Sequence, residues 1–464
     1  MPRKGDILKL NIESLSFGGY GFAKHNGIAI FVEKGLPGQK VEAFIFRKQK
    51  KFYKARINRV ISETAEITDA KCTHFDDCGG CSFQTLNYEQ QISEKYNQVV
   101  EILNHIGKFR DIKVSPILKA DNIYNYRNKM EFAISNNPWY EKYNPVEKKD
   151  FCIGLHPKGR YDKTIDILNC DIQSIIANKV VSIIRRVCIH NKILAYDITN
   201  HTGFMRQAVI RSSDYSNETM IIFVTSFFSK EILKPLINEL SELKEIKSII
   251  NNVNPKKADI SKGTEQHLLY GRDYIFEKLG NYKFKISPDS FFQTNTKQSK
   301  KLYDIIKSEA DLRGHEIVYD LYCGTGTIGI YLSKKAKKVY GFEIVSSAIN
   351  DAIINASENN INNALFFNKD IKDILKDSQI NQIEKPDVSI IDPPRAGLHP
   401  KALKNIINLN QKKLIYISCN PSTQARDLKE FVNNNYKIKK IQPVDMFPHT
   451  PHIESVVTLV NESN

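Results

Sequence analysis

Residues 317–330 read IVYDLYCGTGTIGI, and this stretch decides the fold of the C-terminal half of the chain. An apolar run leads into a glycine-rich loop with the spacing G-x-G-x-x-G at Gly324, Gly326 and Gly329. Glu343 follows nineteen residues after Gly324, at the end of the next apolar run, where a carboxylate can hold ribose hydroxyls. A strand, a glycine loop, a helix and an acid in this order predict a nucleotide site. Either a dinucleotide or S-adenosylmethionine (SAM) fits it.

Outward from this loop, short apolar runs alternate with helical stretches from about residue 296 onward. This alternation is typical of a doubly wound α/β domain, in which helices connect the strands of a mostly parallel sheet. The candidate strands are residues 317–322, 339–345, 364–370, 387–394, 413–420, 436–447 and 455–460.

Three side chains at the ends of these strands point to a reaction. Asp392 closes an apolar run and precedes Pro-Pro-Arg395, where methyltransferases acting on exocyclic amines carry an aromatic residue. The arginine therefore argues against flat stacking for amine transfer. Cys419 ends another strand, before Asn-Pro, where a nucleophile is expected, and Glu454 lies at the start of the last strand.

A cysteine and a carboxylate beside a SAM site define a specific chemistry. C5 of uracil is a poor nucleophile, but a thiolate that adds to C6 turns C5 into an enolate carbon able to attack a methyl sulfonium. A base then removes the C5 proton so that the thiol can leave. We therefore predict Cys419 as the nucleophile and Glu454 as the general base.

The N-terminal residues 1–62 alternate apolar and polar positions and are broken by glycine turns, which predicts a small β-barrel of the OB type. The chain of 464 residues carries a formal charge of +15, which favours a polyanionic partner. A basic run in the barrel contains Phe52 and Tyr53, and cations with interleaved rings indicate RNA or single-strand binding. Its cations are Arg47, Lys48, Lys50, Lys51, Lys54, Arg56 and Arg59.

The central residues carry a cysteine cluster, Cys72-x5-Cys78-Gly-Gly-Cys81, with Cys170 as a candidate fourth thiol. Four thiolates suit either a zinc site or an iron–sulfur cluster, and the spacing does not decide between them. No secretory signal or membrane-spanning stretch is visible, so we expect a cytoplasmic protein without disulfides. A helix is expected at 91–109, and 125–285 read as an α+β region with helices near 174–190 and 230–243 and strands at 129–135, 207–213, 219–227 and 246–254.

At this point the sequence resembles a known family, the SAM-dependent RNA uracil-C5-methyltransferases, in the branch with a TRAM domain and an iron–sulfur cluster. The bacterial 23S rRNA (uracil-C5)-methyltransferases are the most similar members. The resemblance covers nearly the whole chain. It rests on the motifs CTHFDDCGGCSFQ, YRNKMEF, SPDSFFQTN, DLYCGTGTIGI, DPPRAGL, SCNPSTQARDL and HTPHIESVVTL.

The resemblance implies roles for individual residues. It implies a [4Fe–4S] cluster on Cys72, Cys78, Cys81 and Cys170, the roles already given to Cys419 and Glu454, and RNA contacts from the basic barrel, Arg127 and Phe291, with Phe291 near the target base. Family members often carry Asn where this chain has Thr327. The implied SAM contacts are Gln293, Tyr322, Gly324, Gly326, Thr327, Glu343 and Asp370, with Asp392 near the sulfonium end.

The resemblance also implies a domain organisation and a substrate. We expect a TRAM domain at 1–62, a central domain at 63–90 and 125–285, and a catalytic domain at 91–124 and 286–464. The expected partner is RNA, most readily 23S rRNA, with transfer RNA as the alternative, and the expected state is a monomer. Two other readings are an NAD-dependent oxidoreductase, which leaves DPPR, SCNP and the last Glu unexplained, and a non-catalytic RNA-binding protein.

Overall fold

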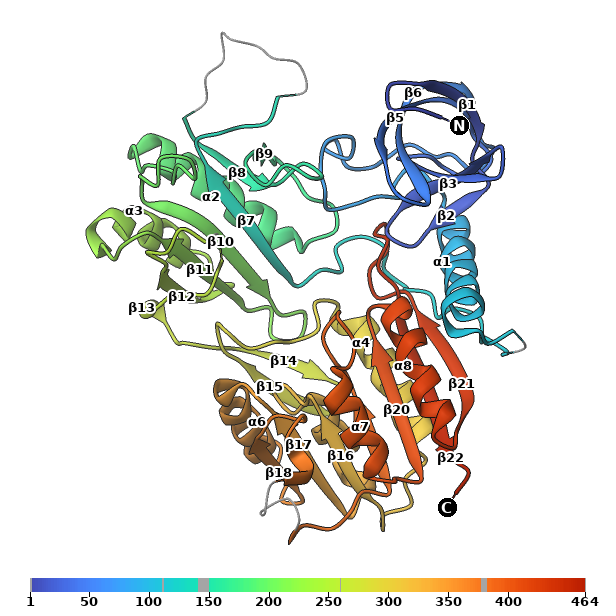
Figure 1. Ribbon diagram of the computed structural model, residues 1–464. Helices are drawn as coiled ribbons and strands as arrows, with labels where there is room; N and C mark the ends of the chain where they lie inside the picture. The colour runs from blue at the N-terminus through green and yellow to red at the C-terminus, as the bar shows by residue number, and fades with distance from the viewer. Residues whose placement is uncertain (1, 111, 141–149, 259, 377–381, 464) are drawn as a thin grey trace.

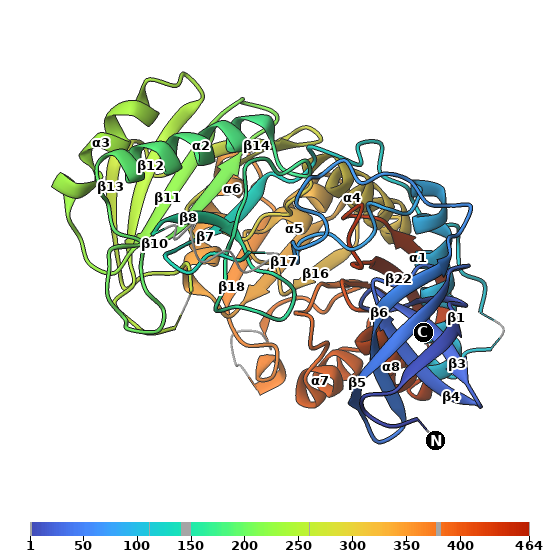
Figure 2. The same ribbon diagram turned by 90° about the horizontal axis from the view of Figure 1, so that it is seen from above.

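The structure is a computed structural model that describes residues 2–110, 112–140, 150–258, 260–376 and 382–463. Three bodies are visible in Figure 1: a small barrel at the N-terminus, a central domain drawn in green, and a larger C-terminal domain below them. Figure 2 shows the same three bodies from above, with the barrel and the central domain at opposite ends.

The barrel is built from short strands in the order β1-β5-β6-β4-β3-β2. Alternate residues point inward and form a core that includes Ile30, Val32 and Ile45. Gly18, Gly19 and Gly27 have positive φ in the tight turns, as expected from the sequence. The strands are β1 (Ile7–Asn11), β2 (Ser14–Ser16), β3 (Tyr20–His25), β4 (Ile28–Glu33), β5 (Lys40–Lys48) and β6 (Phe52–Ser62).

The central domain is a mostly antiparallel sheet in the order β13-β12-β11-β10-β7-β8-β9, packed against two helices. The helices are α2 (Ile175–His190) and α3 (Lys230–Ser241), where the sequence predicts them. The strands β7 (Lys129–Ser135), β10 (Met205–Ser212), β11 (Thr219–Thr225) and β12 (Ile246–Val253) were also expected. The sequence did not reveal β8 (Cys152–Leu155), β9 (Ile165–Asp166) and β13 (Glu265–Gly271).

All the strands predicted for the C-terminal domain are present in one sheet, in the order β18-β17-β16-β19-β20-β22-β21. β16 (Ile317–Leu321) is buried at every position, as a strand covered on both faces must be. The others are β17 (Lys338–Glu343), β18 (Ala364–Asn368), β19 (Val388–Ile391), β20 (Lys413–Ser418), β21 (Tyr436–Val444) and β22 (Glu454–Asn461). The helices are α4 (Thr296–Ala310), α5 (Thr327–Leu332), α6 (Ser346–Glu358), α7 (Pro400–Asn408) and α8 (Pro421–Asn433).

The last strand, β22, brings Glu454 to the edge of the sheet at which the parallel strands end. β16 to β20 run parallel, so their carboxyl ends meet along one edge. β22 lies between β20 and β21 and runs antiparallel to both. Its first residue, Glu454, therefore lies on the same edge as the last residues of the parallel strands.

Two segments pack differently from their neighbours in sequence. The helix α1 (Tyr88–Ile102) starts after the capping residue Asn87 and ends in a π-helical turn, Leu103–Gly107. It lies between the barrel and the C-terminal domain (Figure 1), and its Val99 and Ile102 join the core beneath α8. The hairpin β14 (Ile275–Leu279) and β15 (Tyr282–Ile286) packs into the C-terminal core, although the sequence analysis assigns it to the central domain.

Candidate active site

The glycine loop after β16 turns sharply and leaves room on one side. Tyr322, Gly324 and Gly326 all have positive φ, a conformation that glycine adopts without strain. A Cβ on Gly326 would lie 2.8 Å from the ring of Phe366, whereas a Cβ on Gly324 would meet no atom within 4 Å. The loop is therefore packed tightly at Gly326 and open at Gly324, where a ligand can approach the backbone.

Two carboxylates brace this loop. Gly324 N donates to Glu343 Oε2 at 3.3 Å, and Gly329 N donates to Asp320 Oδ2 at 2.8 Å. The Asp320 side chain is fully buried, and its Oδ1 has no hydrogen-bond partner in the part of the chain that the structure describes. Burial therefore raises the pKa of Asp320 to about 7. Glu343 is partly exposed at the strand end, as a residue that holds a ribose must be.

The remaining predicted SAM contacts surround the loop. Tyr303 and Thr327 share a hydrogen bond between their hydroxyls at 2.9 Å, so the Thr327 side chain is already engaged within the protein. Lys372 Nζ lies 2.9 Å from Asp370 Oδ2, and the backbone amide of Lys372 donates a hydrogen bond to Asp370 Oδ1. These two contacts help to lower the pKa of Asp370 against the opposing effect of burial. Gln293 is partly buried, and its carbonyl accepts a hydrogen bond from Asn128.

Cys419 and Glu454 meet across a strand pair. β20 and β22 pair with Ser418 opposite Ser455, so Cys419 follows one strand while Glu454 opens the other at the same point. Asp392 follows β19, the next strand along the sheet. The charges of Glu454 and Asp392 both raise the pKa of Cys419, which shows how near the three groups lie.

Arg395 is the cation of this cluster, and its role was not predicted from the sequence. Burial raises the pKa of the Cys419 thiol to about 11, and the positive charge of the Arg395 guanidinium opposes this shift. Burial raises the pKa of Glu454 well above its usual range, Asp392 adds to this, and Arg395 opposes it. A buried carboxylate of high pKa is a strong proton acceptor once it is ionised.

The arginine is held in place by its neighbours. Asn420 Nδ2 donates to the Arg395 carbonyl at 3.0 Å, and Arg395 Nη2 lies 3.3 Å from His452 Nδ1. Burial, with a further contribution from Arg395, lowers the pKa of His452 to about 4, so this imidazole is neutral at pH 7 and can accept a hydrogen bond. The DPPR and SCNP motifs therefore contact each other directly through Arg395.

Comparison with known proteins shows which family this sequence belongs to. Residues 212–462, more than half of the chain, match the sequence profile of the tRNA (uracil-5-)-methyltransferase family, and residues 3–57 match that of the TRAM domain. The chain belongs to the tRNA (uracil-5-)-methyltransferase family. It is a SAM-dependent RNA uracil-5 methyltransferase with an N-terminal TRAM domain.

The relatives of this methyltransferase span its full length. An uncharacterized RNA methyltransferase of Chlorobaculum tepidum is 35% identical over 464 residues, covering 98% of this chain and 96% of the relative. One of Bacteroides thetaiotaomicron is 39% identical over 451 residues, covering 95% and 98%. The crystal structure of Pyrococcus abyssi tRNA (uracil-54, C5)-methyltransferase in complex with S-adenosyl-L-homocysteine matches with a TM-score of 0.77 and 29% identity, covering 98% and 100%.

The predicted RNA contacts of the methyltransferase lie in two places. Phe291 is 65% exposed beside the glycine loop, where its carbonyl accepts a hydrogen bond from Thr325. Arg127 Cζ lies 6.0 Å from the centre of the Phe447 ring, and Phe447 belongs to the segment that leads to Glu454. Both side chains thus border the catalytic edge of the sheet, although they come from different parts of the chain.

The basic run of the TRAM barrel is exposed, but one of its two rings is not. Arg47, Lys48, Lys50 and Lys51 are exposed and Lys54 is partly so, stacked at 4.6 Å on the ring of Tyr20. Tyr53, expected from the sequence to stack on bases, is only 3% exposed. It points into the barrel because residues 52 and 54 face outward on the same strand.

The four predicted cluster ligands line one small enclosed cavity. Its volume is about 20 Å³, and apolar side chains including Phe75, Leu155 and Ile172 complete the wall. Burial raises the pKa of all four thiols, to about 11 for Cys78 and about 12 for Cys81. The backbone amide of Gly80 donates to Cys78 Sγ at 3.4 Å, which opposes this shift at Cys78.

Four thiols around one cavity fit a thiolate-bound group in kind and number, and the N–H of Gly80 would stabilise the thiolate of Cys78. Within the described parts of the chain, however, no three His, Cys, Asp or Glu side chains are spaced as a metal site. The sulfurs therefore border a common cavity without converging on one point.

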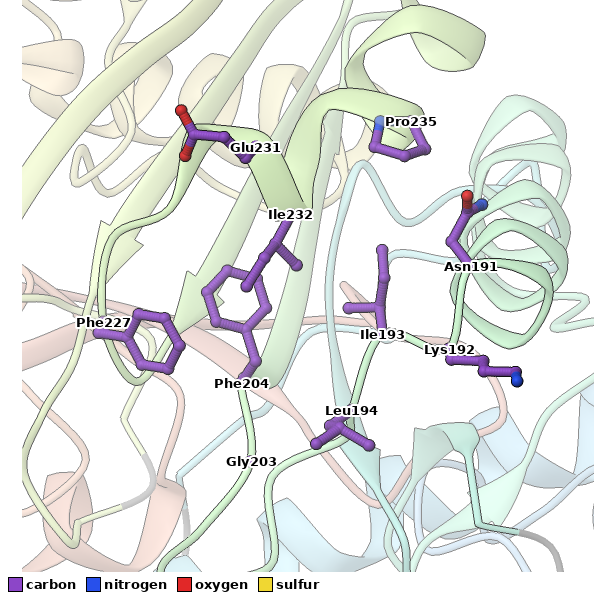
Figure 3. A pocket seen from close by; sticks show the side chains of 10 residues that line it. All are labelled: Asn191, Lys192, Ile193, Leu194, Gly203, Phe204, Phe227, Glu231, Ile232 and Pro235. Atoms are coloured by element: carbon purple, nitrogen blue, oxygen red, sulfur yellow. The ribbon is translucent and has the colours of Figure 1, made fainter.

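Larger cavities lie elsewhere in the methyltransferase. One of about 500 Å³ lies on the central domain, where Phe204, Phe227, Ile232 and Leu194 surround it (Figure 3). Its lining residues do not include any of the predicted site residues. Among the described residues, no helix is both long and apolar enough to cross a membrane.

Proposed function

We propose that this methyltransferase methylates C5 of a uridine in 23S rRNA through a covalent adduct on Cys419, acting in the cytoplasm as a monomer. The observation that supports this most directly is the opposition of Cys419 and Glu454 across the β20–β22 pair, with the charge of Arg395 acting on the thiol. Addition and elimination need a nucleophile and a base within reach of one ring, and this pairing supplies both.

The first step forms the nucleophile. The Cys419 thiol, partly exposed, gives its proton to solvent water, and the charge of Arg395 stabilises the thiolate that results. The thiolate adds to C6 of uracil, which moves the electron pair of the C5–C6 double bond to C5 as an enolate. When bound, SAM would supply the electrophilic methyl group to this carbon and leave as S-adenosyl-L-homocysteine, and Asp392, Glu343 and the open side of Gly324 are the residues that would hold it.

The second step releases the product. Glu454 takes the proton from C5, the electron pair re-forms the C5–C6 double bond, and the bond from C6 to sulfur breaks. Cys419 leaves as a thiolate, again beside Arg395. The raised pKa of Glu454 suits this step because a stronger base accepts a carbon-bound proton more readily.

A uridine inside a helix cannot reach Cys419, so the target must be flipped out or single-stranded. Phe291, exposed beside the loop, would contact the target base, and Arg127 would contact a neighbouring phosphate. The exposed cations Arg47, Lys48, Lys50, Lys51 and Lys54 of the TRAM barrel would hold RNA further away.

Cys72, Cys78, Cys81 and Cys170 would hold a [4Fe–4S] cluster. The apolar cavity that all four thiols line and the N–H of Gly80 directed at Cys78 support this proposal. No step of the methyl transfer requires an electron, so the cluster would serve the structure of the central domain. In that role it would join residues 72–81 to Cys170.

A tRNA is the second candidate substrate. The observation in its favour is the full-length match to the Pyrococcus abyssi enzyme, whose name specifies uracil-54 of tRNA. Mapping of 5-methyluridine by mass spectrometry in rRNA and tRNA from cells with and without the gene tests both candidates. Loss of the mark from 23S rRNA alone supports the proposal, and loss from tRNA alone replaces it with the alternative.

A further inference from the structure

The segment that leads into Glu454 is irregular yet buried. Residues 445–453 lie between β21 and β22 and form neither strand nor helix. Because they lead directly into the proposed base Glu454, they are here called the base-bearing segment. Asp445 and Ile453 are 0% exposed and His449 is 3% exposed, with a positive φ of 65°. Such backbone lacks the partners of a helix or sheet ladder, so side chains from elsewhere must determine its path.

Helix α1 supplies those side chains through a buried ion pair. Lys95 Nζ lies 2.6 Å from Asp445 Oδ1, and both side chains are 0% exposed. The same ammonium donates to the Phe447 carbonyl at 3.2 Å. Tyr88, two helical turns before Lys95 on α1, donates its hydroxyl to the other Asp445 oxygen at 2.8 Å.

Gln91, on the same face of α1, holds the middle of the base-bearing segment. Its Oε1 accepts from His449 N at 3.1 Å, while its Nε2 donates to the carbonyls of Phe83 and Leu86. The His449 carbonyl in turn accepts from Ser82 N at 2.8 Å and from Phe83 N at 3.1 Å. The helix, the loop that follows Cys81 and the base-bearing segment thus form one hydrogen-bonded unit.

This face of α1 is unusual for a helix that packs against a core. Its buried positions include Gln91, Glu94, Lys95 and Gln98, which follow helical spacing where apolar residues are normal. Burying two charges costs several kcal/mol of desolvation for each ion, so a buried pair is weak evidence for stability as such. Its evident effect here is geometric, because a short ion pair fixes the positions of the groups that form it.

We propose that Lys95 and Gln91 are positioning residues for Glu454: they fix the path of the base-bearing segment so that the carboxylate is aligned with the C5 proton of the adduct. The inference rests on the proposed function of Glu454 as the base. Cys419 has separate supports, since Asn420 bonds to Arg395 and caps α8. Loss of Lys95 or Gln91 should therefore slow proton removal and spare the addition of Cys419.

The test separates these two steps in the full-length enzyme. RNA with 5-fluorouridine at the target reports addition and methyl transfer only, because fluorine cannot leave as a cation. RNA with 5-deuterated uridine reports proton removal through a primary isotope effect. For Lys95→Met and for Gln91→Leu we expect turnover to fall about 10–100-fold, consistent with a base misplaced by about 1 Å. The isotope effect should rise and methylated adduct should accumulate, while the rate of fluorouridine trapping stays within about two-fold.

Gln98→Leu is the matched control. Gln98 lies on the same buried face, and neither of its amide atoms has a hydrogen-bond partner among the described residues. Its isotope effect should stay at the wild-type value. Equal losses of turnover and trapping in both test variants, with an unchanged isotope effect, would mean a merely structural role and would overturn the proposal, as would wild-type turnover.

Two further measurements keep the outcome decisive. If Lys95→Met does not fold by circular dichroism, Gln91→Leu, which leaves the ion pair intact, carries the test. Glu454→Gln is measured in parallel. If Glu454→Gln fails to accumulate adduct, the assignment of the base is wrong; if it accumulates adduct and the α1 variants do not, only the positioning role is lost.

Discussion

Cys419 and the four thiols of the central cavity have similar burial but different neighbours. Burial raises the pKa of Cys419 and of Cys78 to about 11 in both places. The positive charge of the Arg395 guanidinium opposes the shift at Cys419, whereas the charges that act on Cys78 are those of Cys170, Cys72 and Asp77, which raise its pKa further. A single thiol beside a cation is suited to act as a nucleophile. Several thiols beside one another are suited to share a bound cation.

The largest effect expected on the Cys419 side of this comparison is that of Cys419→Ala. A methyl side chain cannot add to C6, so methyl transfer should fall by about four orders of magnitude or more. The denaturation-stable protein–RNA band formed with 5-fluorouridine RNA and SAM should vanish, as seen on a denaturing gel. Cys152→Ala removes a buried thiol of the central domain and serves as the control. Methylation by Cys419→Ala would mean direct transfer without an adduct.

Glu454→Gln comes next, because it keeps the nucleophile and removes the base. Turnover should fall about 10²–10⁴-fold. The adduct should still form with ordinary uridine RNA and should then persist, since the proton on C5 has no acceptor. Gel analysis over time measures its formation and decay. A variant that turns over like the wild type would assign the base elsewhere.

Arg395→Gln tests whether the neighbouring cation is what distinguishes Cys419. Without the guanidinium the pKa of the thiol rises, so a smaller fraction is thiolate at any pH below it. Adduct formation should slow about 10-fold at pH 7.5 if the pKa rises by about one unit. The loss should shrink as pH increases, which a pH profile of fluorouridine trapping measures. A loss that is constant across pH would show that Arg395 acts on RNA binding and not on the thiol.

Cys81→Ser should have the smallest effect on chemistry and the clearest effect on metal. Anaerobically purified wild type should contain about four irons per chain and absorb broadly near about 400 nm. The variant should lose iron and melt at a lower temperature, while the fraction that stays folded still forms the Cys419 adduct. Metal analysis and thermal melting measure both. Stoichiometric zinc without iron in the wild type would contradict the cluster.

The sequence was most informative where burial on both faces leaves a continuous apolar run. β16, β19 and β20 are such runs, and the functional residues at their ends were found because strand ends can be located. Tyr53 was misjudged, although the alternation of the strand places it inward with Ala55 and opposite to Phe52. The alternation of the strand therefore did indicate that Tyr53 is buried, but the surrounding cations led to the prediction that its ring stacks on bases.

Other features had no local signal. Arg395 and Cys419 are on different loops, and their contact depends on how β19 and β20 lie side by side. The hairpin Ile275–Leu279 and Tyr282–Ile286 alternates like any two-stranded unit, which does not indicate the domain it packs against. Lys95 and Asp445 are 350 positions apart, and a lysine in an amphipathic helix is normally expected in solvent.

The position of β22 between β20 and β21 affects the order in which the sheet can form during synthesis. A ribosome delivers β20 with Cys419 first, then β21, and only afterwards the strand that belongs between them. Until residues 454–461 emerge, the two earlier strands have no partner to join them, and the reactive sulfur has no base opposite it. The same pairing event closes the sheet and completes the reaction centre. Under the roles proposed for Cys419 and Glu454, an unfinished polypeptide would therefore lack the group that releases RNA from its own cysteine, and the ability to turn over would appear only when the sheet is whole.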